Sequence, residues 1–530
     1  MSPEHSQAQW INIANDVAML PERTFVFGRE APSLDRSAIG VYFSAPAEKQ
    51  IHLLAKHQLT GPRIGWSRPR SRAPKALWTQ SDVRRLPRRS LDAIVAANPR
   101  YTQGLRRTLL ALVFLLQAAH AAVSPDFAER REKLRKNMPD GVLVLFGAKE
   151  SEDLHEGFFQ ETNFYYLTGW EEPGAILVMT PEVDKDEPGL QQRAKLPREI
   201  LFLPQRVVSK EKWTGRKLGP SDTGVAQTTG FANVMPAERL ENELRTLLEA
   251  YPDVYALSAG NAAISRIAPL RNILDAGEPI AKLRMRKSAA EIAAIQRATD
   301  ASIEAHKAAW RVMKPGLVEY EVAAVMVGSY MMDGCRRSAY APIVGSGPNS
   351  TVLHYSRNSR RMDAGEVTVM DVAGECGNYA SDITRTVPVS GEFTARQREI
   401  YDIVLGAQKA AIAAIKPGMT MYRTTPNSLY QIAFEYINTH GKDLHGEPLG
   451  KYFTHGLSHH VGLDVHDADA KEPLEPGMVI TVEPGIYIPE ENIGIRIEDI
   501  VLVTEKGAKI LSEALPRDPS ELERALARKN

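Results

Sequence analysis

The strongest constraint in this sequence is a set of four acidic residues and one histidine in its C-terminal half. The five are Asp371, Asp382, His459, Glu483 and Glu498. Carboxylate oxygens with one imidazole suit Mn²⁺, Co²⁺, Fe²⁺ or Zn²⁺ better than Mg²⁺ or Ca²⁺. Four carboxylates also balance the charge of two dications. The set therefore predicts a site for two adjacent divalent metal ions.

The first two carboxylates lie in a predicted β-hairpin. Two runs rich in β-branched residues are joined by Glu-Cys-Gly-Asn, which has the composition of a turn. A turn centred on Cys376 and Gly377 would place Asp371 directly opposite Asp382, with Cβ atoms about 4.5–5.5 Å apart. Unpaired carboxylates at that distance repel each other, and a metal ion held between them removes the repulsion.

The other two carboxylates repeat this design. A link centred on Glu490 and Glu491 would place Glu483 opposite Glu498. Arg496 is two residues from Glu498 and is therefore expected on the same face of the strand. A lone acid in a strand is usually a solvated residue, but two hairpins with facing acids inside apolar runs weaken that interpretation.

Further histidines accompany this set. His354, His455 and His466 can handle protons near neutral pH if they reach the site, because an unperturbed imidazole titrates near pH 6.5. His460 follows His459 directly and is expected to point to the opposite side, so it is interpreted as structural.

Short sequence blocks occur in a fixed order along the chain. They are Phe159–Trp170 and Trp213–Gly219, followed in the C-terminal half by Ile343–Gly347, Leu353–Tyr355, Met370–Gly374, Asp382–Thr386, His455–His459, Val482–Tyr487 and Ile495–Asp499. These blocks resemble the aminopeptidase P (Xaa-Pro aminopeptidase) branch of the pita-bread metallopeptidases, which also include prolidase and methionine aminopeptidase. The first two blocks resemble that family's first domain and the others its catalytic domain, and the resemblance runs from about Asp126 to Leu511.

The resemblance implies an α+β fold, with a pita-bread catalytic domain at 285–515 preceded by a smaller α/β N-terminal domain at 126–280. It implies two divalent metal ions, with Mn²⁺ expected and Co²⁺, Fe²⁺ or Zn²⁺ as alternatives. The implied metal ligands are Asp371, Asp382, His459, Glu483 and Glu498, with Asp382 and Glu498 bridging. The implied catalytic residues are Glu483, His354 and His466, and the implied substrate-binding residues are His354, His455, His466 and, as a supporting contact, Arg496.

The expected activity is release of the N-terminal residue from peptides with proline second. An X–Pro bond has no N–H to recognise, so a pocket fitted to the pyrrolidine ring is the plausible basis of selectivity. Two alternatives stay open: a prolidase that cleaves Xaa-Pro dipeptides, and a non-catalytic pita-bread binding protein, which the intact ligand set disfavours. Proline-containing peptides and a homo-oligomer, dimer or tetramer, are the expected partners. The balance of 65 basic and 65 acidic residues gives no indication of nucleic-acid binding.

The first 125 residues form a different region. Residues 1–104 are predicted to be poorly structured or a mis-assigned extension; the alternative is a basic interaction tail. Residues 105–122 have a basic start, an apolar core too short to span a bilayer comfortably and an Ala-x-Ala end, which is a secretory signal pattern. Use of this segment, with translation from near Leu105, predicts a periplasmic or secreted protein without a stable membrane span. The alternatives are a buried helix at 108–119 and a cytoplasmic protein.

Local patterns complete the prediction. Strands are expected at Gly141–Phe146 and Ala175–Thr180, and a helix at Glu238–Leu248. A long helix is expected over Lys287–Val312, because the run that starts at Ser288 has a capping-box pattern. The two cysteines give no disulfide framework.

Overall fold

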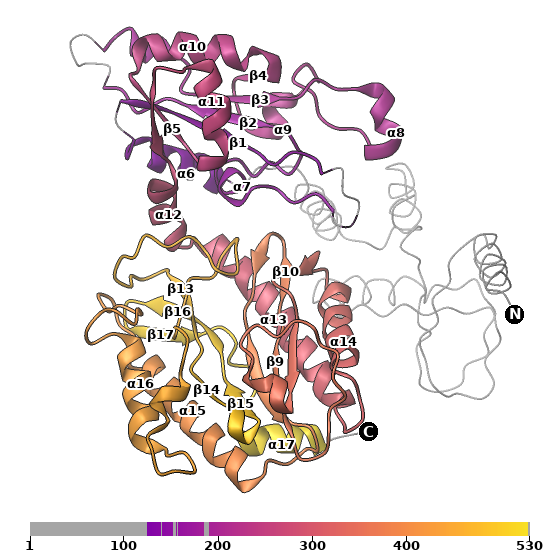
Figure 1. Ribbon diagram of the computed structural model, residues 1–530. Coiled ribbons are helices and arrows are strands. Elements are labelled where there is room, and N and C mark those ends of the chain that lie inside the picture. Colours follow the sequence, from indigo (N-terminus) through magenta and orange to yellow (C-terminus); the bar gives the residue numbers. More distant parts are fainter. Residues whose placement is uncertain (1–124, 139, 152–154, 156, 185–189, 528–530) are drawn as a thin grey trace, which may run out of the picture. The chain divides into compact units, whose positions relative to one another are not determined.

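The computed structural model describes residues 125–138, 140–151, 155, 157–184 and 190–527 (Figure 1). The predicted extension at 1–104 and the signal-like segment at 105–122 lie outside these residues. Among the helices of the described ranges, none is both long and apolar enough to cross a membrane.

The N-terminal part is built around a mixed six-stranded sheet. Its strands are β1 (Gly141–Phe146), β2 (Ile176–Met179), β3 (Glu199–Leu203), β4 (Val234–Pro236), β5 (Asp253–Ala256) and β6 (Asn272–Asp275). Their order in the sheet is β4-β3-β2-β1-β5-β6. The helices of this part are α6 (Pro125–Arg135), α7 (Thr162–Thr168), α8 (Glu211–Thr214), α9 (Val225–Thr229), α10 (Leu240–Ala250) and α11 (Asn261–Ile267).

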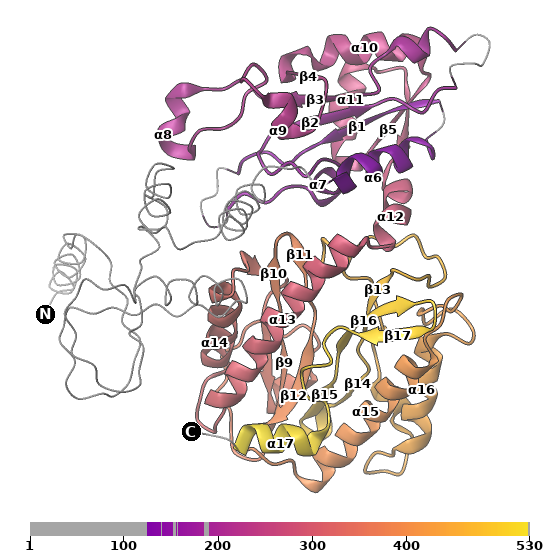
Figure 2. The ribbon, with the colours of Figure 1, turned by 180° about the vertical axis from the view of Figure 1, so that it is seen from behind.

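Helices cover both faces of this sheet. Alternate residues of a strand point to opposite faces. Val142 and Val144 of β1 therefore pack with α10 and α11, whereas Leu143 and Leu145 pack with α6 and α7, and the ribbon shows the sheet between these helices (Figure 2).

These elements confirm the predicted strands and helix of this part. β1 has the predicted bounds, and β2 occupies the centre of the strand expected at Ala175–Thr180. The helix expected at Glu238–Leu248 begins as a 3₁₀ turn, Ala237–Arg239, and continues as α10.

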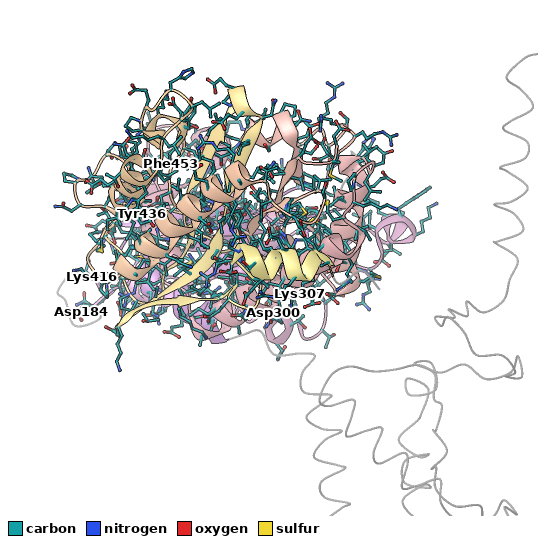
Figure 3. The ribbon with its side chains drawn as sticks, turned by 90° about the horizontal axis from the view of Figure 1, so that it is seen from below. Asp184, Asp300, Lys307, Lys416, Tyr436 and Phe453 are labelled. Carbon is teal, nitrogen blue, oxygen red and sulfur yellow. A yellow bond between two sulfur atoms is a disulfide. The ribbon has the colours of Figure 1, made fainter. Side chains whose placement is uncertain are left out.

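The C-terminal part follows α12 (Gly277–Met285) and repeats one arrangement twice, a pair of long helices followed by antiparallel strands. In the first half these are α13 (Ala289–Val312), α14 (Glu319–Met332), β7 (Arg337–Ser338), β8 (Ile343–Ser346), β9 (Val367–Asp371), β10 (Gly374–Cys376), β11 (Tyr379–Ala380) and β12 (Thr384–Pro388). In the second half they are α15 (Ala395–Ala414), α16 (Leu429–His440), β13 (Val479–Val482), β14 (Gly485–Ile488), β15 (Ile493–Arg496), β16 (Asp499–Thr504) and β17 (Gly507–Ile510). The last helix, α17 (Pro519–Ala527), contacts α13, and the view from below shows it beside Asp300 and Lys307 (Figure 3).

The central strands of the C-terminal part separate an apolar core from a polar face. Met370, Val482 and Ile495 are fully buried in one core cluster that also contains residues of α13 and α15. The residues that follow each of them point the other way, because side chains alternate along a strand. Asp371 and Arg496 thereby reach the polar face, where the candidate site lies.

The long helix α13 confirms the capping-box prediction. The Ser288 hydroxyl accepts a hydrogen bond from the Glu291 backbone N–H at 3.3 Å, and the Glu291 carboxylate accepts one from the Ser288 N–H at 2.9 Å. This fixes where the chain enters the C-terminal part.

The first acid-bearing hairpin is present, but its predicted register is wrong. Asp371 pairs with Thr384 rather than with Asp382. The turn is centred on Gly377 and Asn378, whose φ angles of 61° and 66° are those of a type I′ hairpin turn. Shifting the turn by one residue shifts the register by two. Asp382 therefore stays on the same face as Asp371 but lies diagonally across from it.

The second hairpin confirms its predicted register. Val482 pairs with Asp499 and Gly485 with Arg496, and the same register brings Glu483 opposite Glu498. Both acids lie in the short break between the flanking strand pairs, β13–β16 and β14–β15.

A disulfide joins Cys335 to Cys376, 41 residues apart in sequence. Two cysteines gave the sequence analysis no reason to expect it. The pairing arises because the chain after α14 runs along β10, where the Arg336 N–H donates to the Glu375 carbonyl at 3.0 Å. The bond therefore ties the end of α14 to the hairpin that carries Asp371 and Asp382.

Candidate metal centre

One cavity of about 590 Å³ gathers every site residue predicted from the sequence. This size is typical of cavities that bind small ligands. The predicted residues that line it are Asp371, Asp382, His459, Glu483, Glu498, His354, His455, His466 and Arg496.

Different elements present the five predicted ligands. Asp371 ends β9, and Asp382 lies between β11 and β12. Glu483 and Glu498 occupy the break in the second hairpin, where the Glu498 N–H donates to the Thr384 carbonyl at 3.1 Å and connects the two hairpins. His459 comes from the loop before β13, and its N–H is held by the Thr481 hydroxyl at 3.1 Å.

The central ligand atoms are close enough to share a metal ion. Asp382, His459 and Glu498 each offer an atom, and these atoms all lie within 4.8 Å of one another. His459 Nε2 is 3.3 Å from Asp382 and 3.5 Å from Glu483. His459 Nδ1 donates to the His460 carbonyl at 3.0 Å, which leaves Nε2 as the nitrogen that faces the carboxylates. Metal-binding histidines usually have such a partner on the other ring nitrogen.

The electrostatics of the cavity favour added positive charge. Burial, followed by the repulsion of Asp382, raises the pKa of Glu483 to about 7 despite the nearby His459. Burial and the neighbouring carboxylates also raise the pKa of Glu498 well above its usual value. Burial raises the pKa of Asp371 too, although Arg496 opposes the shift. Crowded buried carboxylates around one imidazole are a donor set that fits divalent cations.

Arg496 supports the predicted ligands from inside the protein. Its guanidinium donates to Asp371 at 2.7 Å, to the Tyr487 hydroxyl at 2.8 Å and to the Thr384 hydroxyl at 3.2 Å. Thr384 in turn donates to Glu498 at 2.7 Å. These contacts engage the Arg496 guanidinium inside the protein, and its supporting role stays a prediction.

Two tyrosines of this network were missed by the sequence analysis. Tyr340 donates to the second oxygen of Asp371 at 2.6 Å and lines the cavity. Tyr487 bridges Arg496 and His455, whose Nε2 is 2.9 Å from the hydroxyl. Tyr487 closes a block that the resemblance had matched, but Tyr340 precedes its block and no spacing rule singles it out.

The histidines occupy different parts of the cavity. His354 and His466 are exposed to solvent, and the His466 ring centre is 4.1 Å from that of His459. His455 is largely enclosed, and burial with the nearby Arg496 lowers its pKa to about 4. His460 is fully buried and does not line the cavity, which agrees with its structural interpretation.

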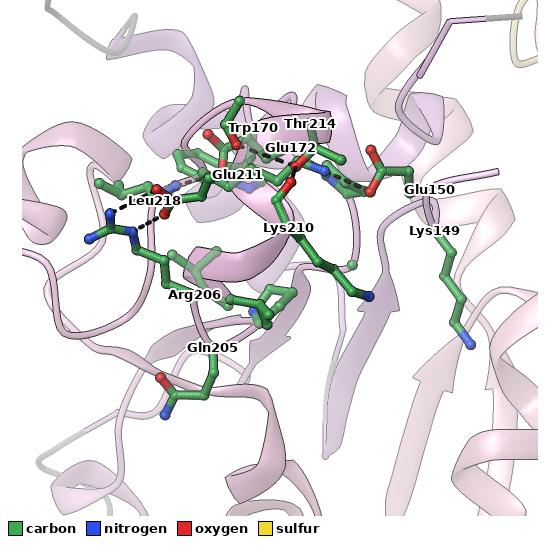
Figure 4. A pocket seen from close by; sticks show the side chains of 17 residues that line it. Lys149, Glu150, Trp170, Glu172, Gln205, Arg206, Lys210, Glu211, Thr214 and Leu218 are labelled. Atoms are coloured by element: carbon green, nitrogen blue, oxygen red, sulfur yellow. Dashed lines mark hydrogen bonds and ion pairs between the residues drawn. The ribbon is translucent and has the colours of Figure 1, made fainter. Parts of the chain in front are cut away.

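A second cavity, of about 240 Å³, lies in the N-terminal part and contains none of the predicted site residues (Figure 4). Its acidic side chains already have partners. Glu150 pairs with Lys217 at 2.8 Å, and Glu172 accepts from the Leu218 N–H at 3.0 Å. It offers no comparable metal-ligand set.

Comparison with known proteins assigns both parts of the chain. Residues 127–255 match the aminopeptidase P N-terminal domain, and residues 293–505 match metallopeptidase family M24. The chain is 34% identical to the Xaa-Pro aminopeptidase of Escherichia coli (strain K12) over 437 residues, which cover 75% of this chain and 96% of the relative. It is 32% identical to Xaa-Pro aminopeptidase 3 of Homo sapiens, over 70% of this chain and 78% of the relative.

Solved structures of aminopeptidase P are also similar to this chain. Aminopeptidase P from E. coli with the inhibitor Pro-Leu superposes with a TM-score of 0.67 at 30% identity, covering 77% of this chain and 99% of that one. Proline aminopeptidase P II from Yersinia pestis gives a TM-score of 0.66 at 30% identity, covering 76% and 99%. The α+β fold with a pita-bread catalytic domain after a smaller α/β domain is thereby confirmed, and the chain belongs to the aminopeptidase P family of M24 metallopeptidases.

Proposed function

We propose that this chain is a metal-dependent Xaa-Pro aminopeptidase, which releases the N-terminal residue from peptides with proline second. One observation carries the proposal: all five predicted metal ligands face one cavity together with His354, His455 and His466. Relatives named Xaa-Pro aminopeptidases, 34% identical over three quarters of the chain, support it.

Two divalent ions are the cofactor we propose, with Mn²⁺ expected and Co²⁺, Fe²⁺ or Zn²⁺ as alternatives. Asp371, Asp382, His459, Glu483 and Glu498 would hold them, and ligand atoms of Asp382, His459 and Glu498 already lie within 4.8 Å of one another. When bound, such a pair lowers the pKa of a water molecule and polarises the scissile carbonyl. Metal analysis of the purified protein by mass spectrometry identifies the ion and its number per chain.

Glu483 is the proposed proton carrier. Its carboxylate lines the cavity beside the histidines, where a group placed next to the reacting atoms can accept a proton and return it. His455 Nδ1 lies 3.7 Å from Oε2 of the Glu483 carboxylate. Glu483 therefore takes a proton from the attacking water and returns it to the proline nitrogen, which leaves as a secondary amine.

His354 and His466 are the proposed groups that act on the substrate directly. Both line the open side of the cavity, where solvent reaches their rings. A ring N–H there can donate to the carbonyl oxygen as negative charge develops on it. His455, held by Tyr487, forms part of the wall against which the substrate lies.

An apolar wall suits the proline ring. Ala341, Ile343, Leu353 and Val465 line the same cavity as the metal ligands. The X–Pro peptide nitrogen has no hydrogen to donate, so selection for proline must depend on the shape of this wall.

Three peptides separate this proposal from its alternative. We expect cleavage of Gly-Pro-Xaa peptides after the first residue and little cleavage of Gly-Ala-Xaa, measured by chromatography of the products. Preferential hydrolysis of the dipeptide Gly-Pro would identify a prolidase instead. Equal cleavage of the alanine peptides would identify a broad aminopeptidase.

We also propose that the chain forms a dimer or tetramer. Two neighbouring methionines at the end of α14 support this, Met331 (51% exposed) and Met332 (83% exposed), because exposed apolar side chains that lie together are typical of interaction sites. Light scattering coupled to gel filtration measures the assembly, and a monomer at micromolar concentration would contradict the proposal.

We propose that the segment at 105–122 directs export of the protein to the periplasm or the exterior of the cell. The Cys335–Cys376 disulfide supports it, because such bonds persist mainly in oxidising compartments. Sequencing the N-terminus of the native protein should find a start near Ala122. An intact Met1 in cytosolic enzyme would contradict export.

A further inference from the structure

The loop that carries His466 is anchored by the residue next to it. His466 lines the cavity, whereas Asp467 points into the protein and is almost fully buried. The Asp467 N–H donates to the His460 carbonyl at 2.9 Å, so the loop folds back on the segment that holds His459. Moving Asp467 would therefore move His466.

Lys287 and Arg284 both form ion pairs with the Asp467 carboxylate. Lys287 Nζ lies 3.0 Å from one carboxylate oxygen, and the Arg284 guanidinium contacts the other. The side chains of all three residues are 3% exposed or less. Burial alone would raise the pKa of Asp467, but Lys287 and Arg284 outweigh it and lower the pKa to about 2. The carboxylate is therefore charged at any working pH.

The Asp467 carboxylate packs closely against the backbone at Gly462. A Cβ atom at Gly462 would collide with the Asp467 carboxylate. The Gly462 N–H donates to the Asp464 carbonyl at 3.0 Å, and the Asp464 carboxylate accepts from Arg284 at 2.8 Å. The loop is thus held at two acidic residues by the same guanidinium.

Arg284 and Lys287 lie at the junction between the two parts of the chain. Arg284 lies in the last turn of α12, and Lys287 directly precedes the capped start of α13. Arg284 also donates to Asn163 of α7 at 2.8 Å, and the Thr162 hydroxyl donates to Asp464 at 2.9 Å. The N-terminal part is therefore joined to the loop through one partly buried polar cluster.

We propose that Arg284 and Lys287 are positioning residues for the peptidase reaction, which hold His466 beside the metal centre through Asp467. The proposal rests on the proposed function. In this proposal the junction between the two parts has a role in catalysis. Arg284 and Lys287 fix the position of the His466 ring, which acts on the substrate, although neither cation lines the cavity. The residues that contact the substrate remain those of the cavity.

Lys287→Met is the first test, because it removes one cation, keeps the buried stem and leaves Asp467 paired with Arg284. Arg286→Met is the matched control, since Arg286 lies beside Lys287 in sequence but is 60% exposed and pairs with Glu475 on the surface. We expect kcat on Gly-Pro-Xaa to fall about 10–100-fold in Lys287→Met, because displacing a group that acts on the substrate by about 1 Å can lower the rate about 10²-fold. Arg286→Met should keep wild-type kcat, and both variants should keep wild-type metal content.

A double-mutant cycle with His466→Ala tests whether the effect passes through His466. If Lys287 only positions His466, adding Lys287→Met to His466→Ala should lower kcat little further. Equal fold losses in both backgrounds would overturn the proposal, because they would show a general structural effect. Wild-type kcat in the single variant would also overturn it.

Hydrogen exchange gives a readout that does not depend on activity. Peptides covering residues 462–469 should exchange faster in Lys287→Met than in wild type or Arg286→Met, and unchanged exchange there would overturn the proposal. If wild type itself fails to cleave Gly-Pro-Xaa, the proposed function fails, while the exchange result still decides whether the cations hold the loop. Should Lys287→Met not fold, Arg284→Lys, which keeps a cation but loses the forked contact, takes its place with the same expected outcomes.

Discussion

At the scale of single residues, the cavity is defined by carboxylates that would repel one another in an apolar setting. Asp371, Asp382, Glu483 and Glu498 meet around one imidazole, and a single buried arginine offsets part of their charge. Removing a charge from water is costly unless a partner compensates. The arrangement is therefore understandable as a metal site and not as a device for stability.

Glu483→Gln should keep the fold but lose activity. The amide is nearly isosteric with the acid, yet it cannot accept a proton and is a weaker metal ligand. Loss of a general base alone lowers rates about 10²–10⁴-fold. Steady-state kinetics on Gly-Pro-Xaa checks this, with exposed Glu490→Gln in the same hairpin as the control. A Glu483→Gln enzyme within a few-fold of wild type would rule out the proposed role.

At the scale of elements, the two hairpins show how far sequence patterns reach. Both were predictable from β-branched runs and turn composition, and the second had the predicted register. The first did not, because Gly377 and Asn378 adopt positive φ angles and move the turn by one residue. Composition located the turn, but only the backbone geometry fixed its centre.

The long helix α13 carries a pH-sensitive contact with the first hairpin. His306 is fully buried, with Nε2 3.1 Å from the Ile383 carbonyl, and burial, aided by Arg385, lowers its pKa to about 3. As the pH falls through about 6.5, the His306 ring takes up a proton in the unfolded chain but not in the folded chain. The stability contributed by the neutral ring is thus complete above about pH 6.5 and is lost progressively as the pH falls toward 3.

Denaturant unfolding of wild type and His306→Gln measures this contribution. Between about pH 7.5 and pH 5, wild type should lose about 1–2 kcal/mol more stability than the variant, which has no ring to protonate. Parallel pH profiles for the two proteins would show that His306 is not held neutral by burial.

The disulfide between α14 and β10 should also stabilise the fold. Closing 41 residues restricts the unfolded chain and is worth about 4 kcal/mol on chain-entropy grounds. A reducing agent should therefore lower the melting temperature of wild type but leave that of Cys376→Ser unchanged. The same response in both proteins would show that the bond contributes nothing.

At the scale of the whole molecule, the sequence was informative wherever a function needs short motifs in a fixed order. The proposed metal ligands, the histidines that line the cavity and the two-part organisation were all visible in this way. The sequence patterns did not reveal Tyr340, the disulfide or the ion pairs of Arg284 and Lys287 with Asp467. Each depends on residues tens to nearly two hundred positions apart that meet only after folding, such as Arg284 and Asp467. Periodicity and turn chemistry carry no information about such long-range pairs.

The most direct test of the central claim is a metal titration of metal-free wild type and Asp382→Ala, with bound ions and Gly-Pro-Xaa hydrolysis followed together. Asp382 lies within reach of both His459 and Glu498, so its loss should empty or misplace the ion pair. Wild type should bind two ions per chain and gain activity as they fill. Asp382→Ala should bind fewer and remain inactive, whereas His460→Ala, altered outside the cavity, should bind two ions and retain activity. Full metal content with comparable activity in Asp382→Ala would contradict the account.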